Sequence, residues 1–192
     1  TIHLINDAST DNPLEIIDNI LKIHRPDCNL KVYDNQENLG AVRNQVELIN
    51  KLDPENIVIL VDGDDWLYPD PEIFHKINNL YHADCEFSYG SCWSLVDGIP
   101  LIAQPYPPNI QQNKQYRSHR FAWNMPYTHL RTFRARMLHI YKDSTYQDDN
   151  GNWLKAGGDT ALFYAALEAA HPDKVVCVPD LWYVYNDAHS DN

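Results

Sequence analysis

Cysteine is scarce in this chain of 192 residues, and its four copies form no CxxC pair. A chain of this length can build a core without disulfides, so we expect reduced, mostly buried thiols. No apolar stretch approaches the ~20 residues of a membrane span, the longest being 57–61. No charged-then-apolar leader opens the chain either. We therefore expect no membrane span and a cytoplasmic location.

Positive charge is also in short supply. Fifteen Lys and Arg stand against 27 Asp and Glu, which gives a formal net charge of −12. A protein with this negative charge repels nucleic acid and anionic lipid, so we expect no nucleic-acid partner. A ligand that carries phosphate needs a cation in its binding site. No Ser/Gly run or proline-rich tract marks a linker, and 44% hydrophobic residues exclude a disordered chain. We therefore expect one globular domain.

The first half of the chain alternates predicted strands and helices. Apolar spacing predicts a strand at 2–5, a helix after Pro13, a strand at 30–33, a helix at 41–52, a strand at 57–61 and a helix at 70–80. The run at 57–61 is typical of a strand buried on both faces at the centre of a parallel sheet. A helix from Asp159 and strands at 175–178 and 181–185 close a more mixed second half. The pattern predicts an α/β fold.

Three aspartates follow the run at 57–61 directly, in the tetrapeptide Asp62-Gly63-Asp64-Asp65. Ligands of α/β proteins bind at the carboxyl ends of strands, and buried carboxylates need a cation to share their site. Oxygen ligands of this kind suit Mg²⁺ or Mn²⁺. A solvated acidic turn that caps the next helix explains the same residues equally well.

Three sequence blocks together resemble one family. LINDASTD at 4–11, ENLGAVRNQ at 37–45 and VILVDGDDWLYPD at 58–70 are similar, in this order, to segments of family 2 glycosyltransferases of GT-A fold. The resemblance implies a Rossmann-like mixed, mostly parallel sheet flanked by helices. It also implies a single transferase domain over 1–192, with a nucleotide-binding part at 1–81 and an acceptor and catalytic part at 82–192.

The resemblance implies nucleotide contacts for two residues. Asp7 matches the family aspartate that hydrogen-bonds the base, and Arg43 matches an arginine near the nucleotide. Each has a structural alternative. Asp7 could form an Asx turn or a helix cap together with Ser9 and Thr10, and Arg43 could pair with Glu47 one helical turn away.

In the acidic turn, the resemblance separates the roles of the aspartates. Asp62 matches the residue that contacts the ribose, Asp64 the ligand of the metal that bridges the donor diphosphate, and Asp65 could act through water. The segment YNDAHSDN at 185–192 resembles a block whose histidine reaches the same metal, so His189 is the second metal candidate, with a surface histidine as the alternative. The implied cofactor is Mn²⁺ or Mg²⁺, which offsets the charge of the leaving UDP as a Lewis acid.

A general base is implied by the segment AGGDTALFY at 156–164. It resembles the block whose aspartate deprotonates the acceptor hydroxyl, which makes Asp159 the candidate catalytic residue. The preceding Gly157 and Gly158 would let the backbone approach a sugar closely. Gly158 stands where many family members have Glu. A plain N-cap aspartate is the structural alternative.

Positive charge gathers between residues 123 and 138, at His129, Arg131 and Arg134. Arg131 is our candidate for a contact to the donor diphosphate or sugar. Similar blocks occur in viral and bacterial transferases resembling those that glycosylate hydroxylysine in collagen-like proteins, so such a hydroxylysine is one candidate acceptor. A strand with the arginines on an exposed face is the alternative.

The sequence departs from the family at its beginning. The strand and helix that usually precede the segment matching residues 2–7 do not occur, so an interior strand of the sheet and half of the base pocket would be absent. Because residue 1 is Thr and a strand-like run starts at once, we expect a fragment, a processed form or a renumbered chain. Open sheet edges would also invite association into an oligomer.

The resemblance thus implies a metal-dependent, inverting transferase. It would move a hexose from a nucleotide sugar, with UDP sugars as the first class, to a hydroxyl of a glycan or protein. Two alternatives stay open. A sugar-nucleotide pyrophosphorylase needs an N-terminal Gly-rich phosphate loop that this sequence lacks. A non-catalytic carbohydrate- or metal-binding domain derived from a transferase would lack turnover.

Overall fold

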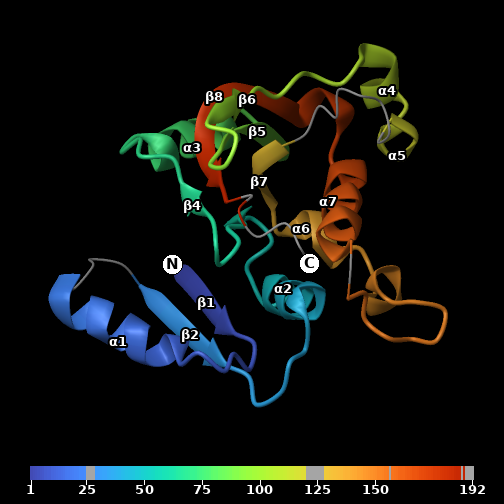
Figure 1. The fold of residues 1–192 in the computed structure, drawn as a ribbon. Coiled ribbons are helices and arrows are strands. Elements are labelled where there is room, and N and C mark those ends of the chain that lie inside the picture. The colour runs from blue at the N-terminus through green and yellow to red at the C-terminus, as the bar shows by residue number, and fades with distance from the viewer. Residues whose placement is uncertain (25–28, 120–127, 156, 187, 189–192) are drawn as a thin grey trace.

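The strands of this chain form two separate sheets. The computed structural model describes residues 1–24, 29–119, 128–155, 157–186 and 188. The smaller sheet pairs β1 (Ile2–Asn6) in parallel with β2 (Leu30–Asp34), and α1 (Pro13–His24) connects them. Pro13 suits the first turn of α1 because its fixed φ is helical and its missing N–H would have no helical partner there. In Figure 1 this N-terminal unit, drawn in blue, lies apart from the larger sheet.

The larger sheet has six strands. Their order is β3 (Ile57–Ile59), β7 (Thr128–Arg134), β5 (Phe87–Ser94), β8 (Val175–Tyr185) and β4 (Trp66–Leu67), and β6 (Ile99–Leu101) pairs with β5. The remaining elements are α2 (Ala41–Ile49), α3 (Ile73–His82), α4 (Pro108–Gln112), α5 (Tyr116–His119), α6 (Arg136–His139), η1 (Asp143–Tyr146), α7 (Gly158–Ala169) and η2 (Pro172–Lys174). The chain therefore has the mixed α/β class that its sequence predicts.

The strand directions differ from the prediction of a mostly parallel sheet. The pairs β1–β2 and β5–β8 are parallel, whereas β3–β7, β5–β7, β5–β6 and β4–β8 are antiparallel. A parallel pair needs a long crossover, and antiparallel neighbours do not. A short turn at residues 95–98 connects β5 to β6, and this makes their antiparallel pairing possible.

The run at 57–61 is only partly as predicted. Both of its faces pack against apolar side chains: Val58 belongs to one buried cluster, and Ile57 and Ile59 pack against the other. The predicted central position is wrong, because β3 stands at the end of the six-stranded order with β7 as its neighbour. Hydrophobicity reports what covers the faces of a strand and not which strands flank it.

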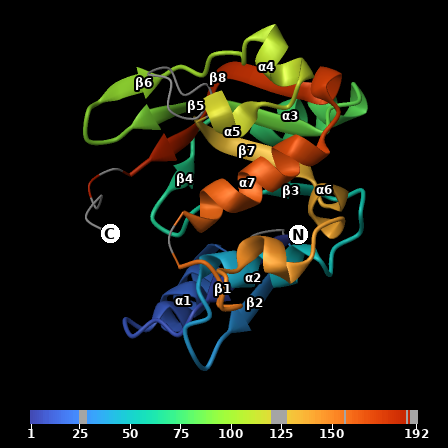
Figure 2. The same ribbon diagram turned by 90° about the vertical axis from the view of Figure 1, so that its right-hand side faces the viewer.

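Helices cover both faces of the larger sheet. On one face, α7 buries Leu162, Phe163, Ala166 and Leu167, and its C-cap residue Ala170 is buried as well. On the other face, α3 buries Ile73, Ile77 and Tyr81. Figure 2 shows α7 crossing in front of the sheet and α3 behind it.

The helix α2 joins the N-terminal unit to the larger sheet. It follows Gly40, whose φ of 84° favours a residue without a side chain, and it buries the stripe Val42, Val46 and Ile49. In both views α2 lies between the small sheet and α7 (Figures 1 and 2). Residues that follow β1 and β2 are therefore held close to the beginning of α7.

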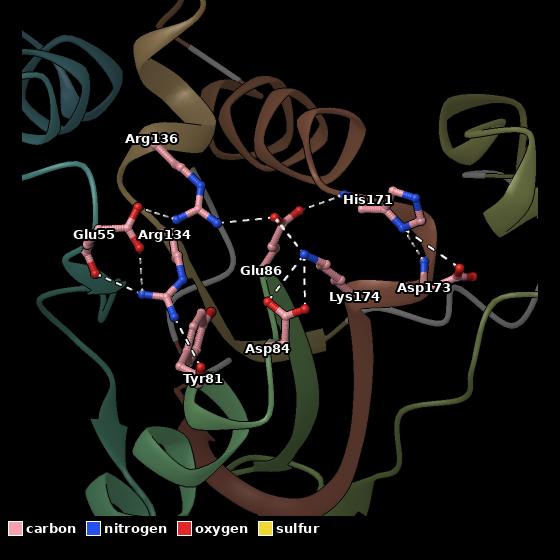
Figure 3. Close-up of polar contacts among 9 residues, drawn as sticks. All are labelled: Glu55, Tyr81, Asp84, Glu86, Arg134, Arg136, His171, Asp173 and Lys174. Atoms are coloured by element: carbon pink, nitrogen blue, oxygen red, sulfur yellow. Dashed lines mark hydrogen bonds and ion pairs between the residues drawn. The ribbon is translucent and has the colours of Figure 1, made fainter.

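A network of ion pairs closes the end of the larger sheet at which β3, β5 and β8 begin (Figure 3). Its centre is Glu86, which accepts hydrogen bonds from Arg136 Nη2 at 3.1 Å and from the backbone N–H of His171 at 2.7 Å. Lys174 Nζ lies 3.7 Å from the same carboxylate, and Glu55 pairs with Arg136 as well. The acidic turn follows the opposite end of β3, so this network stabilises the sheet far from the candidate site.

Two further predictions concern cysteines and membranes. Cys85 and Cys92 are buried free thiols and Cys177 is a half-buried one, while Cys28 lies outside the described residues. Within the described part of the chain, none of the helices combines the length and the apolar character needed to cross a bilayer.

Candidate functional site

The acidic turn connects β3 to β4 at the carboxyl end of β3. The backbone N–H of Asp65 donates to the carbonyl of Asp62 at 3.1 Å and closes the turn. Asp62, Gly63 and Asp64 are exposed, whereas Asp65 is half-buried. The three carboxylates therefore differ in environment: two face solvent and one faces the protein.

Strand β8 holds this turn in place. Trp66 and Leu67 pair with Val184 and Tyr183. The hydroxyl of Tyr183 donates to Asp65 Oδ2 at 2.6 Å and accepts the backbone N–H of Asp62 at 3.2 Å. The backbone N–H of Asn186 donates to Asp65 Oδ1 at 2.7 Å. The chain thus leaves β8 directly beside the acidic turn.

Aromatic contacts lead from Tyr183 to a buried cation. The ring of His129 stacks on those of Tyr183 and Tyr185, with centroids 4.6 Å and 5.5 Å apart. Arg131 Nη2 lies 3.4 Å from His129 Nε2, and the Arg131 guanidinium stacks 4.1 Å from the ring centroid of Phe163. Phe163 belongs to α7, one helical turn after Asp159. A continuous set of contacts therefore runs from the acidic turn to the first half of α7.

Arg131 and His129 are not on an exposed strand face. Arg131 is 6% exposed and its neighbours Leu130 and Thr132 are buried, so the alternative of a solvated strand is wrong. Burial, followed by the charge of Arg131, lowers the pKa of His129 to about 3. The imidazole is therefore neutral at physiological pH, and with its proton on Nδ1 it accepts from Arg131. The guanidinium of Arg131 therefore carries a positive charge beside a neutral histidine.

Asp7 is held by hydrogen bonds to the segment that precedes α2. Its carboxylate accepts from Asn35 Nδ2 at 2.8 Å, from the N–H of Leu39 at 2.9 Å and from the N–H of Gly40 at 2.8 Å. Burial raises the pKa of Asp7, but the hydrogen bonds to Asn44, Leu39, Asn35 and Gly40 outweigh it, and the net pKa is lowered. The carboxylate is thus ionised and ties β1 to the start of α2. Its contact to a nucleotide base stays a prediction.

Two other predicted alternatives can be compared with the structure. Asn6, not Asp7, accepts the N–H of Ser9, at 3.1 Å. Arg43 Nε donates to Glu47 Oε1 at 2.7 Å, which is the i,i+4 ion pair that the sequence allows. The approach of Arg43 to a nucleotide stays a prediction.

Asp159 is the second residue of α7, which begins at Gly158 after the left-handed Gly157, with φ of 65°. Gly158 is in close contact with α2, because a Cβ added there would lie 1.7 Å from Cγ2 of Val42. Its departure from the family pattern therefore has a steric cause: a Glu at 158 would collide with Val42. The role of Asp159 as a base stays a prediction.

The predicted metal ligands are only partly within the described structure. Asp64 is exposed on the turn, and His189 lies outside the described residues. Among the side chains that are described, no three of His, Cys, Asp or Glu form a group that could hold a metal ion. The chemistry of the turn still fits a hard cation, because Asp62 and Asp64 are exposed carboxylate residues at the end of β3.

Comparisons with known proteins identify the family. Residues 1–145 match the model described as glycosyl transferase family 2. The chain belongs to this family. No curated protein sequence matches it.

Solved structures similar to this family 2 chain include the crystal structure of S. aureus TarS 1–349, with a TM-score of 0.64, 19% identity, and coverage of 96% of this chain and 50% of that chain. The same protein in complex with UDP has a TM-score of 0.63 and 18% identity, and the match covers 96% of this chain and 50% of that chain. A further structure of S. aureus TarS has a TM-score of 0.62 and 18% identity, and the match covers 96% of this chain and 30% of that chain. The likeness confirms the GT-A-like mixed α/β fold. The chain spans about half the length of the TarS 1–349 structures that it matches.

Sequence reasoning missed Tyr183 and the inward orientation of Asp65. Tyr183 lies more than 100 positions from the turn that it contacts, and its own segment has no motif. The one sequence signal was the identification of 181–185 as a strand, which does not say what that strand touches.

Proposed function

We propose that this chain is the catalytic part of a glycosyltransferase that moves a hexose from a UDP sugar to a hydroxyl acceptor, with inversion and with Mn²⁺ or Mg²⁺. The observation that carries the proposal is the acidic turn at the end of β3, with Asp62 and Asp64 exposed, in a chain of family 2. A buried arginine, Arg131, is connected to this turn through His129 and Tyr183. A similar fold in TarS occurs in complex with UDP, which supports the choice of nucleotide.

The donor would be held by four side chains, Asp62, Asp7, Arg131 and Arg43. Asp62 contacts the ribose and Asp7 the base, since both follow the carboxyl ends of strands. Arg131 faces the diphosphate, because a guanidinium in a region of low dielectric attracts an anion strongly. Arg43 is the third residue of α2, the helix whose N-terminal segment is held by Asp7, and would contribute from there.

Asp64 and His189 would hold the divalent ion. When bound, the ion supplies Lewis-acid stabilisation of the charge on the leaving diphosphate. The exposed carboxylate of Asp64 supports this assignment, and so does the position of Asn186, which brings the chain to the turn shortly before His189.

Asp159 would act as the general base. The acceptor hydroxyl attacks the anomeric carbon from the face opposite the diphosphate, Asp159 takes its proton, and the bond from that carbon to the phosphate oxygen breaks to release UDP. Support comes from α7, since Phe163, one turn beyond Asp159, contacts Arg131. We propose a glycan or protein hydroxyl as the acceptor class, and a collagen-like hydroxylysine stays an untested example of it.

Binding measurements test the donor. UDP, GDP and CDP sugars are titrated by calorimetry and thermal shift with and without Mn²⁺, and we expect stabilisation by UDP sugars that depends on the ion. Asp64→Ala should abolish the ion-dependent part. Asp18→Ala, an exposed aspartate of α1, removes the same charge and should bind as wild type.

Turnover measurements separate the base from the metal ligand. Asp159→Asn should keep donor binding while the release of UDP from a UDP-hexose falls by orders of magnitude. Equal loss of binding in Asp159→Asn and Asp64→Ala would contradict the assigned roles. Donor binding without UDP release in wild type would favour the non-catalytic alternative, and pyrophosphate-dependent formation of a nucleoside triphosphate would favour the pyrophosphorylase.

A further inference from the structure

The aspartates of the acidic turn do not have equal access to a ligand. Both carboxylate oxygens of Asp65 already accept a hydrogen bond from β8 or its end: Oδ2 from the Tyr183 hydroxyl at 2.6 Å and Oδ1 from the Asn186 N–H at 2.7 Å. Asp62 and Asp64 are exposed. The turn thus has a side that faces the protein and a side that faces solvent.

Tyr183 contacts the turn at both of its ends. Its hydroxyl donates to Asp65 and accepts the N–H of Asp62, so a single oxygen joins the first and the last residue of the turn. Tyr183 is 0% exposed, and the ring of His129 stacks on its ring with centroids 4.6 Å apart. A hydroxyl held in this way is limited to one position, because a fully buried ring packed on a neighbour has little freedom to move.

We infer that Tyr183 and Asp65 are positioning residues that fix the shape of the acidic turn, so that Asp62 and Asp64 face the donor and Asp65 is not a ligand. The inference rests on the proposed function for the identity of the ligand. This inference differs from the expectation that Asp65 acts toward the metal through water. Each carboxylate oxygen of Asp65 already accepts a hydrogen bond from the protein.

The energetic argument is that of a buried polar group that loses its partner. Without the Tyr183 hydroxyl, Asp65 Oδ2 and the Asp62 N–H each lose a hydrogen bond inside the protein, and water must reach both groups or the turn must change shape. Either response alters the positions of Asp62 and Asp64. Ligands that need a fixed arrangement of carboxylates are sensitive to shifts of this size.

The test compares Tyr183→Phe with Tyr81→Phe in the full chain. Tyr81 is a matched control, because it is also a buried tyrosine (4% exposed) whose hydroxyl makes a side-chain hydrogen bond, to Thr132 at 2.9 Å, and it packs in the same apolar cluster away from the turn. Asp65→Asn and Asp64→Asn complete the set. Amide hydrogen exchange over residues 61–67 and the affinity for UDP with Mn²⁺ are measured at a temperature at which every variant is folded.

We expect Tyr183→Phe to accelerate exchange over 61–67 and to weaken UDP binding about tenfold, as loss of one hydrogen bond to a charged group would. Tyr81→Phe should leave both unchanged even though it lowers the melting temperature. Asp65→Asn should weaken binding to a similar degree, while Asp64→Asn abolishes the Mn²⁺-dependent part.

Three results would overturn the inference: unchanged exchange over 61–67 in Tyr183→Phe, the same UDP affinity in Tyr183→Phe and Tyr81→Phe, or complete loss of binding in Asp65→Asn. The last would make Asp65 a ligand. If wild type binds no UDP at all, the proposed function is wrong, and the exchange data alone then decide whether Tyr183 holds the turn. If Tyr183→Phe does not fold, exchange in Asp65→Asn decides the same question.

Discussion

Single side chains in this protein show why burial and charge must be considered together. Glu86 has a side chain only 13% exposed, yet it stays ionised because donors surround it. Burial raises its pKa, but the N–H of His171, the side chain of Arg136 and the charge of Lys174 lower it more, so the net pKa lies below the ordinary 4.5. A carboxylate with a lowered pKa stabilises the fold above its unfolded-state pKa, and this contribution disappears as the pH falls through the folded-state pKa.

Glu86→Gln should therefore be destabilising in a pH-dependent way. We expect its free energy of unfolding in urea to fall by about 1–3 kcal/mol near pH 7, because a hydrogen-bonded charge is lost. The difference from wild type should shrink as the pH drops below 4.5, where the native carboxyl itself becomes protonated. Glu55→Gln is the control, since its side chain is 64% exposed and exposed ion pairs contribute little. A Glu86→Gln deficit that is equal at pH 7 and at pH 3 would contradict this account.

At the scale of elements, the contact between α2 and α7 depends on one missing side chain. A Cβ at position 158 would lie 1.7 Å from Cγ2 and 3.1 Å from Cβ of Val42, so a larger residue at 158 requires the side chain of Val42 or one of the helices to move. The same contact keeps the start of α7, with Asp159, beside the helix that follows the segment held by Asp7. Packing of two helices thus sets the distance between two candidate site residues.

Gly158→Ala should be destabilising for this reason, and Val42→Ala should partly rescue it. Overpacking of this kind costs about 1–3 kcal/mol or more, and the double variant should be more stable than the sum of the two single losses predicts, by about 1 kcal/mol. Urea unfolding of the four proteins gives this coupling energy. Gly63→Ala is the control, because an added Cβ there has nothing within 4 Å. Strictly additive losses would show that the two positions are not in steric contact.

The whole molecule consists of two parts with unequal burial. The larger sheet is covered on both faces, whereas β1 and β2 pair only with each other among the described strands, and the N-terminal unit leaves large apolar side chains exposed: Ile2, Ile16, Ile20, Ile23 and Val32. A two-stranded sheet with one helix buries little apolar surface for the backbone that it orders. The unit depends for its position on contacts such as those of Asp7.

Native-state hydrogen exchange should reveal this difference. We expect amides of β1, α1 and β2 to exchange through an opening of lower free energy than those of β5 and β8, which exchange only when the larger sheet unfolds. The measurement is exchange at increasing urea concentration, followed by peptide. Identical opening free energies across both sheets would show that the chain unfolds as one cooperative unit.

The sequence alone determined much of this protein, and the reason is that the informative signals are local. Apolar periodicity predicted the helices near 13, 41, 70 and 159 and the strand-helix alternation of the first half, and the motif blocks predicted family 2, which the family match confirms. The position of three carboxylates after an apolar run left a metal site and a solvated turn equally open, and the family resemblance made the acidic turn the candidate site. The division into parts at 1–81 and 82–192 stays a prediction.

Tertiary structure decided what depends on contacts between distant residues. It placed β3 at the end of its sheet, made most pairings antiparallel, and buried Arg131 against Phe163. It also turned Asp65 toward Tyr183, which stands 118 positions later in the chain. No local pattern carries such information, because a tyrosine in a strand has the same sequence environment whether its hydroxyl meets an aspartate or solvent. Residue types thus selected the candidate site, and packing determined which of its carboxylates is hydrogen-bonded to the protein.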